Sequence, residues 1–302
     1  MQGFTSGDYP RGKLQHVKVN TMNIQWCNQV VLLTGATGGI GQAIAKALDE
    51  KGAHIILTGR SKAKLEQLQQ NLTLHHTAIV ADITSDEGRD RVVSACQRLP
   101  LSILVNNAGI TYMGEFEGTP IESIVSTNML APMLLTQRLL PLLERRPSAH
   151  VVNVGSAFGS IGFAAHGTYC ATKFALKGWT EAMHREFSDS KIKFHYLAPR
   201  ATRTDINDER ANALNEALGN QTDEPDAVAQ AFIKQLENNL PRVALGCAER
   251  FFAKLNALVP SVVDNALAKK LPTIKRYAFQ KTQSQDKQTS AQNDTRLGNK
   301  LV

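Results

Sequence analysis

Three side chains in the middle of the sequence have the types and spacing needed for proton transfer to oxygen. Tyr169 and Lys173 are four residues apart, which on a helix places them on one face, about 5–6 Å apart at Cβ. A free tyrosine titrates near pH ~10, and a neighbouring ammonium lowers that pKa by favouring the phenolate. Ser156 ends an expected strand, so its hydroxyl could hold a substrate oxygen beside Tyr169. The alternative for Tyr169 and Lys173 is an ordinary surface pair.

A glycine-rich turn near the start of the sequence has the composition of a phosphate-binding loop. It reads Thr34-Gly-Ala-Thr-Gly-Gly-Ile-Gly41 and joins an apolar run to an amphipathic stretch. Glycines permit positive φ and let backbone N–H groups approach a pyrophosphate at a helix N-terminus. Its place between an expected strand and an expected helix favours a nucleotide site over a simple tight turn.

Short apolar runs alternate with amphipathic stretches through most of the sequence. The expected strands cover 29–34, 54–58, 77–81, 101–105, 149–154, 192–197 and 242–245, and the expected helices cover 40–48, 61–72, 86–99, 121–143, 169–187 and 225–236. This alternation predicts an α/β fold in which a doubly wound parallel sheet has helices on both faces. Ligands bind such sheets beyond the carboxyl ends of the strands, where the glycine-rich turn and Ser156 both fall.

These features together resemble the short-chain dehydrogenase/reductase family over roughly residues 27–245. The turn has the family's TGxxxGxG pattern, and the other motifs follow in register: Asp82, Asn106-Asn-Ala-Gly109, Asn128, Ser156, Tyr169-Cys-Ala-Thr-Lys173 and residues 199–204. The resemblance implies a Rossmann-type three-layer αβα domain. It also implies an NAD(P)-dependent oxidoreductase acting on CH–OH groups, such as a ketoreductase or alcohol dehydrogenase.

The resemblance gives roles to four expected catalytic residues. Tyr169 would donate or accept the proton, Lys173 would hold the nicotinamide ribose, and Ser156 would polarise the carbonyl. Asn128 would maintain a water in the proton path, and hydride would pass between cofactor and substrate carbon. No metal site is expected. The residues expected to bind the cofactor are Gly35, Thr37, Gly39, Ile40, Gly41, Arg60, Asp82, Ile83, Asn107, Ala108, Gly109, Tyr169, Lys173, Pro199, Thr202 and Thr204.

The end of the second expected strand distinguishes the two nicotinamide cofactors. Family members that prefer NAD usually have an aspartate there, which binds the ribose 2′-hydroxyl. Gly59 takes that place here and Arg60 follows, so a guanidinium is available to pair with a 2′-phosphate. We therefore expect NADP(H). Gly38 departs from this expectation, because many NADP-binding members have a basic residue inside the loop.

The region after the sixth expected strand contains a departure from the family pattern and a polar segment. Arg200 replaces the usual glycine after Pro199, and it is expected either to contact an anionic substrate group or to pair with a carboxylate. Residues 205–223 are polar, lack a strong apolar face and lie where a mobile lid would sit. This segment is expected to decide much of the substrate choice.

A helical C-terminal extension is expected after the family's usual end. Apolar residues recur at helical spacing over 250–271, and Pro260 is expected to start a second helix. The extension is either a helical pair packed on the body or on a subunit, or an interfacial membrane helix. The expected divisions are a polar N-terminal extension (1–25), the catalytic domain (26–248), the amphipathic extension (249–272) and a basic, disordered tail (273–302).

The net charge of +7 is concentrated at the ends of the chain. Residues 269–302 hold eight basic and two acidic residues, and residues 1–25 hold three and one. No nucleic-acid-binding motif accompanies this charge, so no nucleic-acid partner is expected. The basic end is interpreted either as a solvated tail or, together with the amphipathic stretch, as peripheral membrane contact through 250–302.

Cysteine usage and hydropathy bear on the compartment. Four widely spaced cysteines form no CxxC pair, no secretory signal is visible, and no apolar run approaches ~18 residues. We therefore expect a cytoplasmic protein, free or peripheral to the inner face of a membrane. Met22 closely precedes the first expected strand and is an alternative start to Met1.

The leading hypothesis is an NADP(H)-dependent reductase of a hydrophobic ketone or a 3-oxoacyl compound. A homo-oligomer is expected, because family members are often dimers or tetramers. One alternative is a cofactor-sensing protein without turnover, against which the complete set of Asn128, Ser156, Tyr169 and Lys173 argues. The other is a membrane-recruited enzyme that acts on a lipid.

Overall fold

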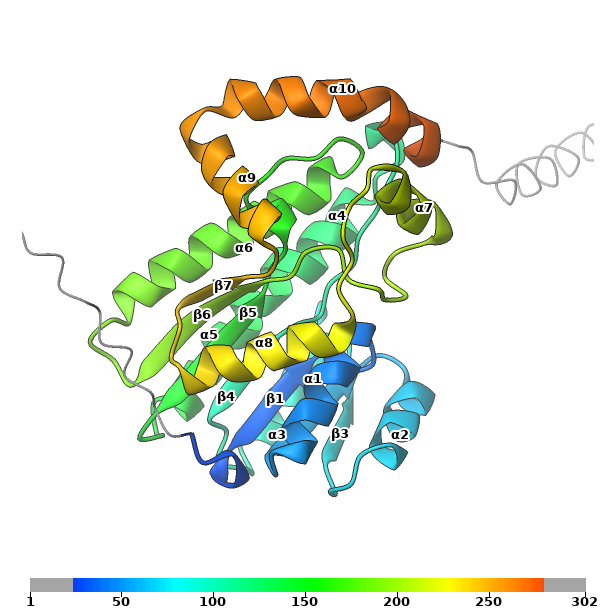
Figure 1. The fold of residues 1–302 in the computed structure, drawn as a ribbon. Coiled ribbons are helices and arrows are strands. Elements are labelled where there is room, and N and C mark those ends of the chain that lie inside the picture. The colour runs from blue at the N-terminus through cyan, green and yellow to red at the C-terminus, as the bar shows by residue number, and fades with distance from the viewer. Residues whose placement is uncertain (1–23, 280–302) are drawn as a thin grey trace, which may run out of the picture.

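Parallel strands form the centre of the molecule. The computed structural model describes residues 24–279, and within them a seven-stranded sheet has the order β3-β2-β1-β4-β5-β6-β7, with every neighbouring pair parallel (Figure 1). This is the doubly wound topology predicted above, with the strand order reversing between β1 and β4. The strands are β1 (Val30–Thr34), β2 (His54–Gly59), β3 (Thr77–Val80), β4 (Ile103–Asn106), β5 (Ala149–Val154), β6 (Ile192–Ala198) and β7 (Arg242–Ala244).

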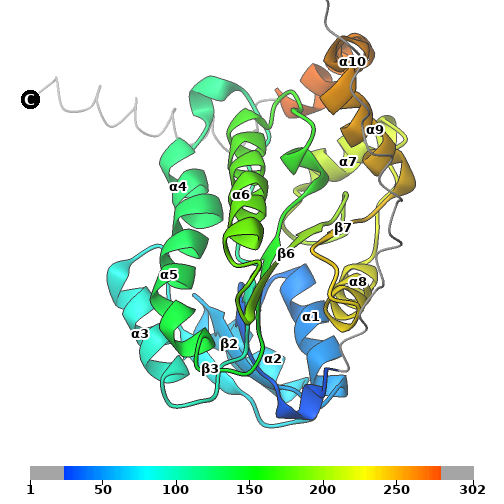
Figure 2. The same cartoon turned by 90° about the vertical axis from the view of Figure 1, so that its left-hand side faces the viewer.

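Helices cover both faces of the sheet, as Figure 2 shows from the side. One face carries α1 (Gly39–Glu50), α2 (Lys62–Gln70) and α8 (Pro225–Glu237). The other carries α3 (Asp86–Cys96), α5 (Ala131–Leu143) and α6 (Gly167–Glu186). Shorter elements are α4 (Ile121–Val125) and four turns of 3-10 or π type: η1 (Trp26–Asn28), η2 (Phe116–Gly118), η3 (Ser126–Leu130) and η4 (Ala157–Gly159).

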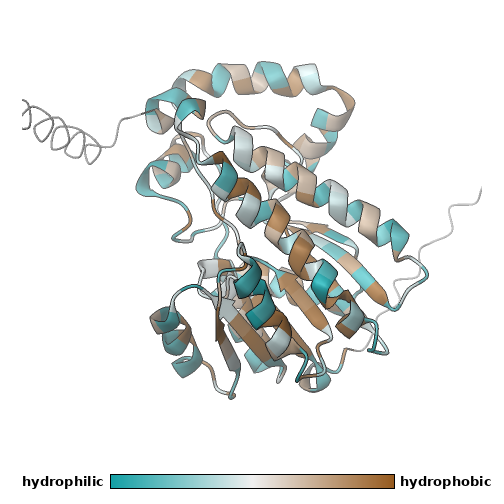
Figure 3. Ribbon diagram, turned by 180° about the vertical axis from the view of Figure 1, so that it is seen from behind, coloured by the Kyte–Doolittle hydropathy of each residue, from teal (hydrophilic) through white to brown (hydrophobic). Residues whose placement is uncertain are grey.

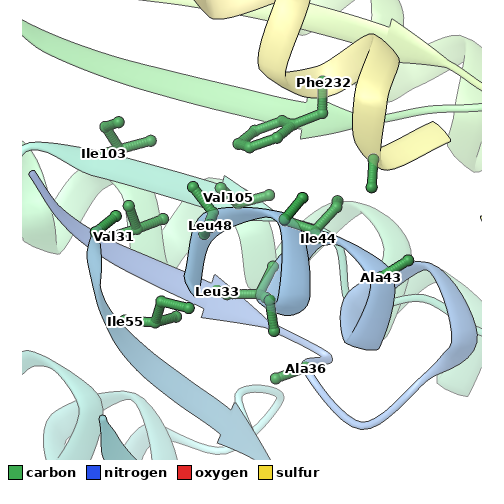
Figure 4. Close-up of a cluster of buried hydrophobic side chains, with 14 of the residues drawn as sticks. Val31, Leu33, Ala36, Ala43, Ile44, Leu48, Ile55, Ile103, Val105 and Phe232 are labelled. Carbon is green, nitrogen blue, oxygen red and sulfur yellow. The ribbon is translucent and has the colours of Figure 1, made fainter. Parts of the chain in front are cut away.

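Two apolar layers hold the helices to the sheet. Successive residues of β1 point to opposite faces, so Val31 and Leu33 join one layer while Leu32 joins the other. Both faces are covered, which is why β1 is a continuous apolar run rather than an alternating one. Figure 4 shows part of the first layer, where Leu48 of α1 packs on the side of Val31 and Leu33, and Phe232 of α8 lies on the side of Ile103 and Val105 of β4. In Figure 3 the strands are accordingly mostly brown.

The helix expected at 121–143 differs from the prediction. It is divided into α4, the π-helical turn η3 and α5, with Asn128 inside the turn. Apolar periodicity continues through the turn, so the sequence pattern gives no sign of it. Single π-turns inside helices often occur at functional sites, and this one places the Asn128 side chain in the interior.

The C-terminal part corrects two expectations. The segment 205–223 is not a polar lid without an apolar face, because it contains α7 (Glu209–Ala217), whose Leu214 is buried. The helical extension consists of α9 (Cys247–Leu258) and α10 (Pro260–Ala278), so it continues beyond residue 272, where a tail was expected to begin. Both differences have one cause: Leu214 packs with Ile274 and Ala278 of α10 in a separate apolar cluster.

The remaining expectations for the ends of the chain fall outside the described residues. They concern residues 1–23, which include the alternative start at Met22, and residues 280–302 of the basic tail. Between Ile24 and Phe279, no helix combines the length and the hydrophobicity required to cross a bilayer.

Candidate active site

One cavity of about 850 Å³ lies beyond the carboxyl ends of the strands. Loops that follow β1 through β6 line it, as expected for a doubly wound sheet. It brings together every residue predicted for catalysis or cofactor binding except Asn128, which lies directly behind the wall. Residues as far apart in the sequence as Gly35 and Thr204 therefore share one site.

The glycine-rich turn is packed so closely that side chains would not fit. Gly35 has φ +63°, and a Cβ there would lie 2.7 Å from the Cα of Ala108. A Cβ on Gly39 would lie 2.5 Å from Cγ2 of Thr204. Gly39 is the first residue of α1, so the N-terminal N–H groups of that helix face the cavity, an arrangement that suits a pyrophosphate.

Thr34 is a positioning residue that the motif analysis did not single out. Its hydroxyl donates to the Val105 carbonyl at 3.1 Å and accepts from the backbone N–H groups of Asn107 and Ala108. The Asn107 side chain in turn donates to the carbonyls of Thr34 and Gly35, at 3.0 and 3.1 Å. These bonds fix the loops after β1 and β4 to each other, so the cofactor side of the cavity is preorganised.

Basic side chains gather at the end of β2. Arg60 and Lys64 both line the cavity beside Gly59 and Thr37. Lys64 was missed in the sequence, although its place in the first turn of α2, four residues after Arg60, was a usable signal. The pKa of the nearby Asp82 carboxyl is lowered, mainly because Thr84 donates two hydrogen bonds to it, so this carboxylate is charged and held in place. Ile83 lines the cavity next to Asp82.

Tyr169 and Ser156 meet at the other end of the cavity. Ser156 follows β5, and Tyr169 lies in the first turn of α6. Burial raises the pKa of Tyr169 to about 12, and a hydrogen bond with the Ser156 side chain opposes this only in part. The net pKa of Tyr169 is therefore above its usual value, contrary to the expected lowering, because desolvation of the phenolate dominates. The hydroxyl of Tyr169 remains protonated at neutral pH.

Lys173 and Asn128 lie behind the tyrosine. The Lys173 ammonium donates to the carbonyl of Val154 at 3.0 Å and lies 5.6 Å from the centroid of the Tyr169 ring. Burial lowers its pKa from 10.5 to about 8. The Asn128 amide donates to Ile110 O at 2.8 Å and to Thr172 Oγ1 at 3.2 Å. Asn128 thus fixes the loop after β4 against α6 and is itself 1% exposed.

The cavity continues from Tyr169 into an apolar region. Phe158 and Phe163 stack with their centroids 5.0 Å apart, and the Tyr169 ring meets Phe158 edge-on. Helices α7, α9 and α10 supply the opposite wall, and the sequence pattern did not show which side of these helices faces the cavity. The cavity-lining apolar residues of this region are Met113, Phe158, Ile161, Phe163, Leu214, Leu218, Phe252, Val263 and Leu267.

Arg200 takes the second of its two expected roles. Its guanidinium donates to Asp223 Oδ1 and to Gln221 Oε1, each at 2.7 Å, and Glu249 lies 3.8 Å away. These contacts raise the pKa of Arg200, chiefly through Asp223. The arginine lines the cavity but is paired with a carboxylate, and it joins α9 to the loop after β6.

Comparisons with known proteins agree with this architecture. A family model described as short chain dehydrogenase matches residues 29–215. The ketoacyl reductase HetN of Nostoc sp. is 32% identical over 224 residues, which is 71% of this chain and 77% of that protein. The family model therefore covers strands β1 to β6 and most of the site.

Two solved structures also resemble the chain, each at 25% identity and a TM-score of 0.65. One is a short-chain dehydrogenase from Sphingobium yanoikuyae in complex with NADPH, with coverage of 78% of this chain and 96% of that one. The other is a 3-ketoacyl-(acyl-carrier-protein) reductase from Brucella melitensis complexed with NADH, with coverage of 72% and 96%. The two relatives hold different nicotinamide cofactors.

Proposed function

The chain belongs to the short-chain dehydrogenase family and is an NAD(P)-dependent oxidoreductase, and we propose that it reduces a hydrophobic ketone or 3-oxoacyl compound with NADPH. One observation carries the proposal: the cavity joins Tyr169 and Ser156 to a glycine cradle on one side and to an apolar region on the other. A carbonyl between these two regions would lie against both hydroxyls.

The residues at Tyr169 support proton donation to a carbonyl oxygen. A bound nicotinamide would supply the hydride to the carbonyl carbon. The Ser156 hydroxyl holds the carbonyl oxygen by a hydrogen bond and stabilises the negative charge that develops on it. Tyr169, protonated at neutral pH, then donates its proton to that oxygen and completes the alcohol.

Lys173 supports this step through charge. Its buried ammonium lies close enough to the Tyr169 ring to stabilise the phenolate that proton transfer leaves behind. It is also directed toward the loop after β4, where a Cβ on Gly109 would lie 3.7 Å from its Nζ. That position suits a contact with the ribose beside the nicotinamide.

The corner around Arg60 and Lys64 supports the choice of NADPH. Two cations line the cavity where a ribose 2′-phosphate would lie, and Gly59 leaves no carboxylate at the end of β2. A guanidinium binds phosphate through parallel hydrogen bonds, whereas a 2′-hydroxyl gains little from it. The relatives bind NADPH or NADH, so the preference rests on these residues.

Removing the Arg60 guanidinium tests the cofactor preference. We expect Arg60→Ala to weaken NADPH binding about 10-fold or more and to change NADH binding less than about twofold, because only NADPH carries the 2′-phosphate. Lys64→Ala should act in the same direction. Lys62→Ala is the matched control, since Lys62 lies on the same helix, pairs with Glu66 and does not line the cavity. Equal losses for both cofactors would contradict the assignment.

The proposed reaction is tested by fluorescence titration with NADPH and NADH, followed by turnover with a panel of ketones and 3-oxoacyl thioesters. Tight NADPH binding with turnover of an apolar ketone or a thioester is the expected result. Cofactor binding without turnover over the whole panel would favour the alternative of a cofactor sensor.

We also propose that the protein is a cytoplasmic homo-oligomer. Exposed apolar side chains on the α4–α6 side of the molecule support self-association: Ile121, Leu130 and Phe174 are each more than 40% exposed. Apolar side chains of this size on one side of a protein are typical of subunit contacts.

A further inference from the structure

Helix α9 is apolar on a side that nothing in the described chain covers. None of its twelve residues is buried, although its sequence is amphipathic. Phe251 is 63% exposed and Leu258 is 81% exposed, and Val259 and Val262 are also exposed where α9 meets α10. We refer to Phe251, Leu258, Val259 and Val262 as the α9–α10 corner. In Figure 1 this corner projects from the end of the molecule beyond the carboxyl edge of the sheet.

The exposed side chains are arranged in a stripe rather than scattered. Phe251 and Leu258 are exposed and lie along one side of α9, at i and i+7, with the partly buried Leu255 between them at i+4. Val262, in the first turn of α10, lies close to the end of this stripe. A contiguous apolar stripe at a projecting end is costly to leave in water and indicates a surface that is covered in function.

The charges around the corner identify what covers it. Arg250 and Lys254 stand on α9 beside the apolar stripe. Within α9 and α10 there are six basic residues and two acidic ones; of these, Lys270 lines the cavity and the acid Glu249 faces Arg200. Apolar side chains bordered by cations match the interface of a bilayer that contains anionic lipids. The basic residues of the two helices are Arg250, Lys254, Lys269, Lys270, Lys275 and Arg276.

The same two helices also form a wall of the cavity. Phe252 of α9 and Val263 and Leu267 of α10 line it, within one to five residues of the exposed corner. If the proposed reduction of a hydrophobic substrate holds, the corner would place the apolar region of the cavity next to the phase in which such a substrate dissolves. Membrane contact and substrate entry would then involve one structural element.

We propose that the α9–α10 corner docks the protein on an anionic membrane surface. Phe251, Leu258, Val259 and Val262 enter the boundary between head groups and acyl chains, while Arg250 and Lys254 stay among the lipid phosphates. Helix α9 then lies in the plane of the interface and does not span the bilayer.

The test is sedimentation of the full chain with vesicles of phosphatidylcholine, with and without about 30% phosphatidylserine. We expect binding to the anionic vesicles, weakened by added salt. Leu258→Glu combined with Val262→Glu should lower the bound fraction at least about fivefold, and Arg250→Gln with Lys254→Gln should lower it on anionic vesicles in particular. None of these four residues lines the cavity, so circular dichroism and NADPH binding should remain unchanged.

Leu74→Glu is the matched control. Leu74 is an exposed leucine in the loop before β3, at the amino ends of the strands and therefore at the opposite end of the sheet from α9. This variant should bind vesicles like the wild type. The proposal is overturned if the corner variants sediment like the wild type. It is also overturned if the wild type binds neither kind of vesicle and forms a dimer that Leu258→Glu abolishes, because the corner would then be a contact between two copies of the chain. Vesicle binding is measured without substrate turnover, so failure of the membrane proposal and failure of the proposed reaction can be told apart.

Discussion

Tyr169→Phe should lower kcat for ketone reduction by about 10²–10⁴-fold, the range typical of losing a general acid. The hydroxyl is the group that burial keeps protonated in the cavity, and phenylalanine preserves the ring that packs edge-on against Phe158. NADPH affinity should change less than about twofold, because the substitution removes no phosphate contact. Steady-state kinetics and a fluorescence titration on the same preparation measure both quantities.

Tyr196→Phe provides the control for that experiment. Tyr196 is a second buried tyrosine whose hydroxyl lies 3.4 Å from both the backbone N and the carbonyl O of Ser156. Its loss removes long hydrogen bonds to the backbone and no proton donor, so we expect less than about a 10-fold decrease in kcat. Full turnover by Tyr169→Phe, or equal losses in both variants, would show that Tyr169 is not the acid.

Lys173→Met should abolish most activity and at the same time stabilise the fold. The variant keeps the length of the side chain but removes the charge that supports proton transfer, so we expect kcat to fall about 10²–10³-fold. The pKa of Lys173 is lowered from 10.5 to about 8 by burial, which corresponds to a cost of about 3 kcal/mol for holding the ammonium in the folded protein. The variant also loses the hydrogen bond from Lys173 to the Val154 carbonyl, which offsets about 1 kcal/mol of its gain in stability.

The sign of the stability change depends on pH. Below pH 8 the ammonium is charged in both folded and unfolded chains, so its full burial cost is present and the variant should gain about 1–2 kcal/mol. Between pH 8 and 10.5 the folded chain binds fewer protons than the unfolded chain, so the wild type gains stability as the pH rises through this interval. Urea unfolding at pH 7 and at pH 10 should therefore show that the variant exceeds the wild type in free energy of unfolding by less at pH 10 than at pH 7. A variant that is less stable at pH 7 would contradict this account.

Most of the cofactor side of the site could be predicted from the sequence because it is built from local signals. The glycine-rich turn, the end of β2 and the start of α6 each need particular residue types at fixed spacings, since backbone geometry and helix periodicity dictate them. The doubly wound sheet in turn requires these segments to meet at one edge. This is why Gly35, Asp82, Ser156 and Tyr169 line a single cavity although they are far apart in the chain.

The substrate side depended on contacts between distant segments that no local pattern encodes. Residues 205–223 show no strong apolar face in the sequence, and only the packing of Leu214 against Ile274 and Ala278 makes α7 and α10 a wall of the cavity. The sequence allowed two roles for Arg200, and its ion pairs with Asp223 and Glu249, which are distant in the chain, decide between them.

The sequence by itself determined the fold, and it predicted which residues meet at the carboxyl edge of the sheet, because periodicity and motif spacing act over short stretches of chain. The tertiary structure alone decided the direction in which the pKa of Tyr169 moves. Spacing predicts that Lys173 favours the phenolate, but desolvation depends on everything packed around the hydroxyl and outweighs that single charge. It also decided which apolar residues of α9 and α10 face the cavity and which face outward, since a helix's own periodicity does not say which side its neighbours cover.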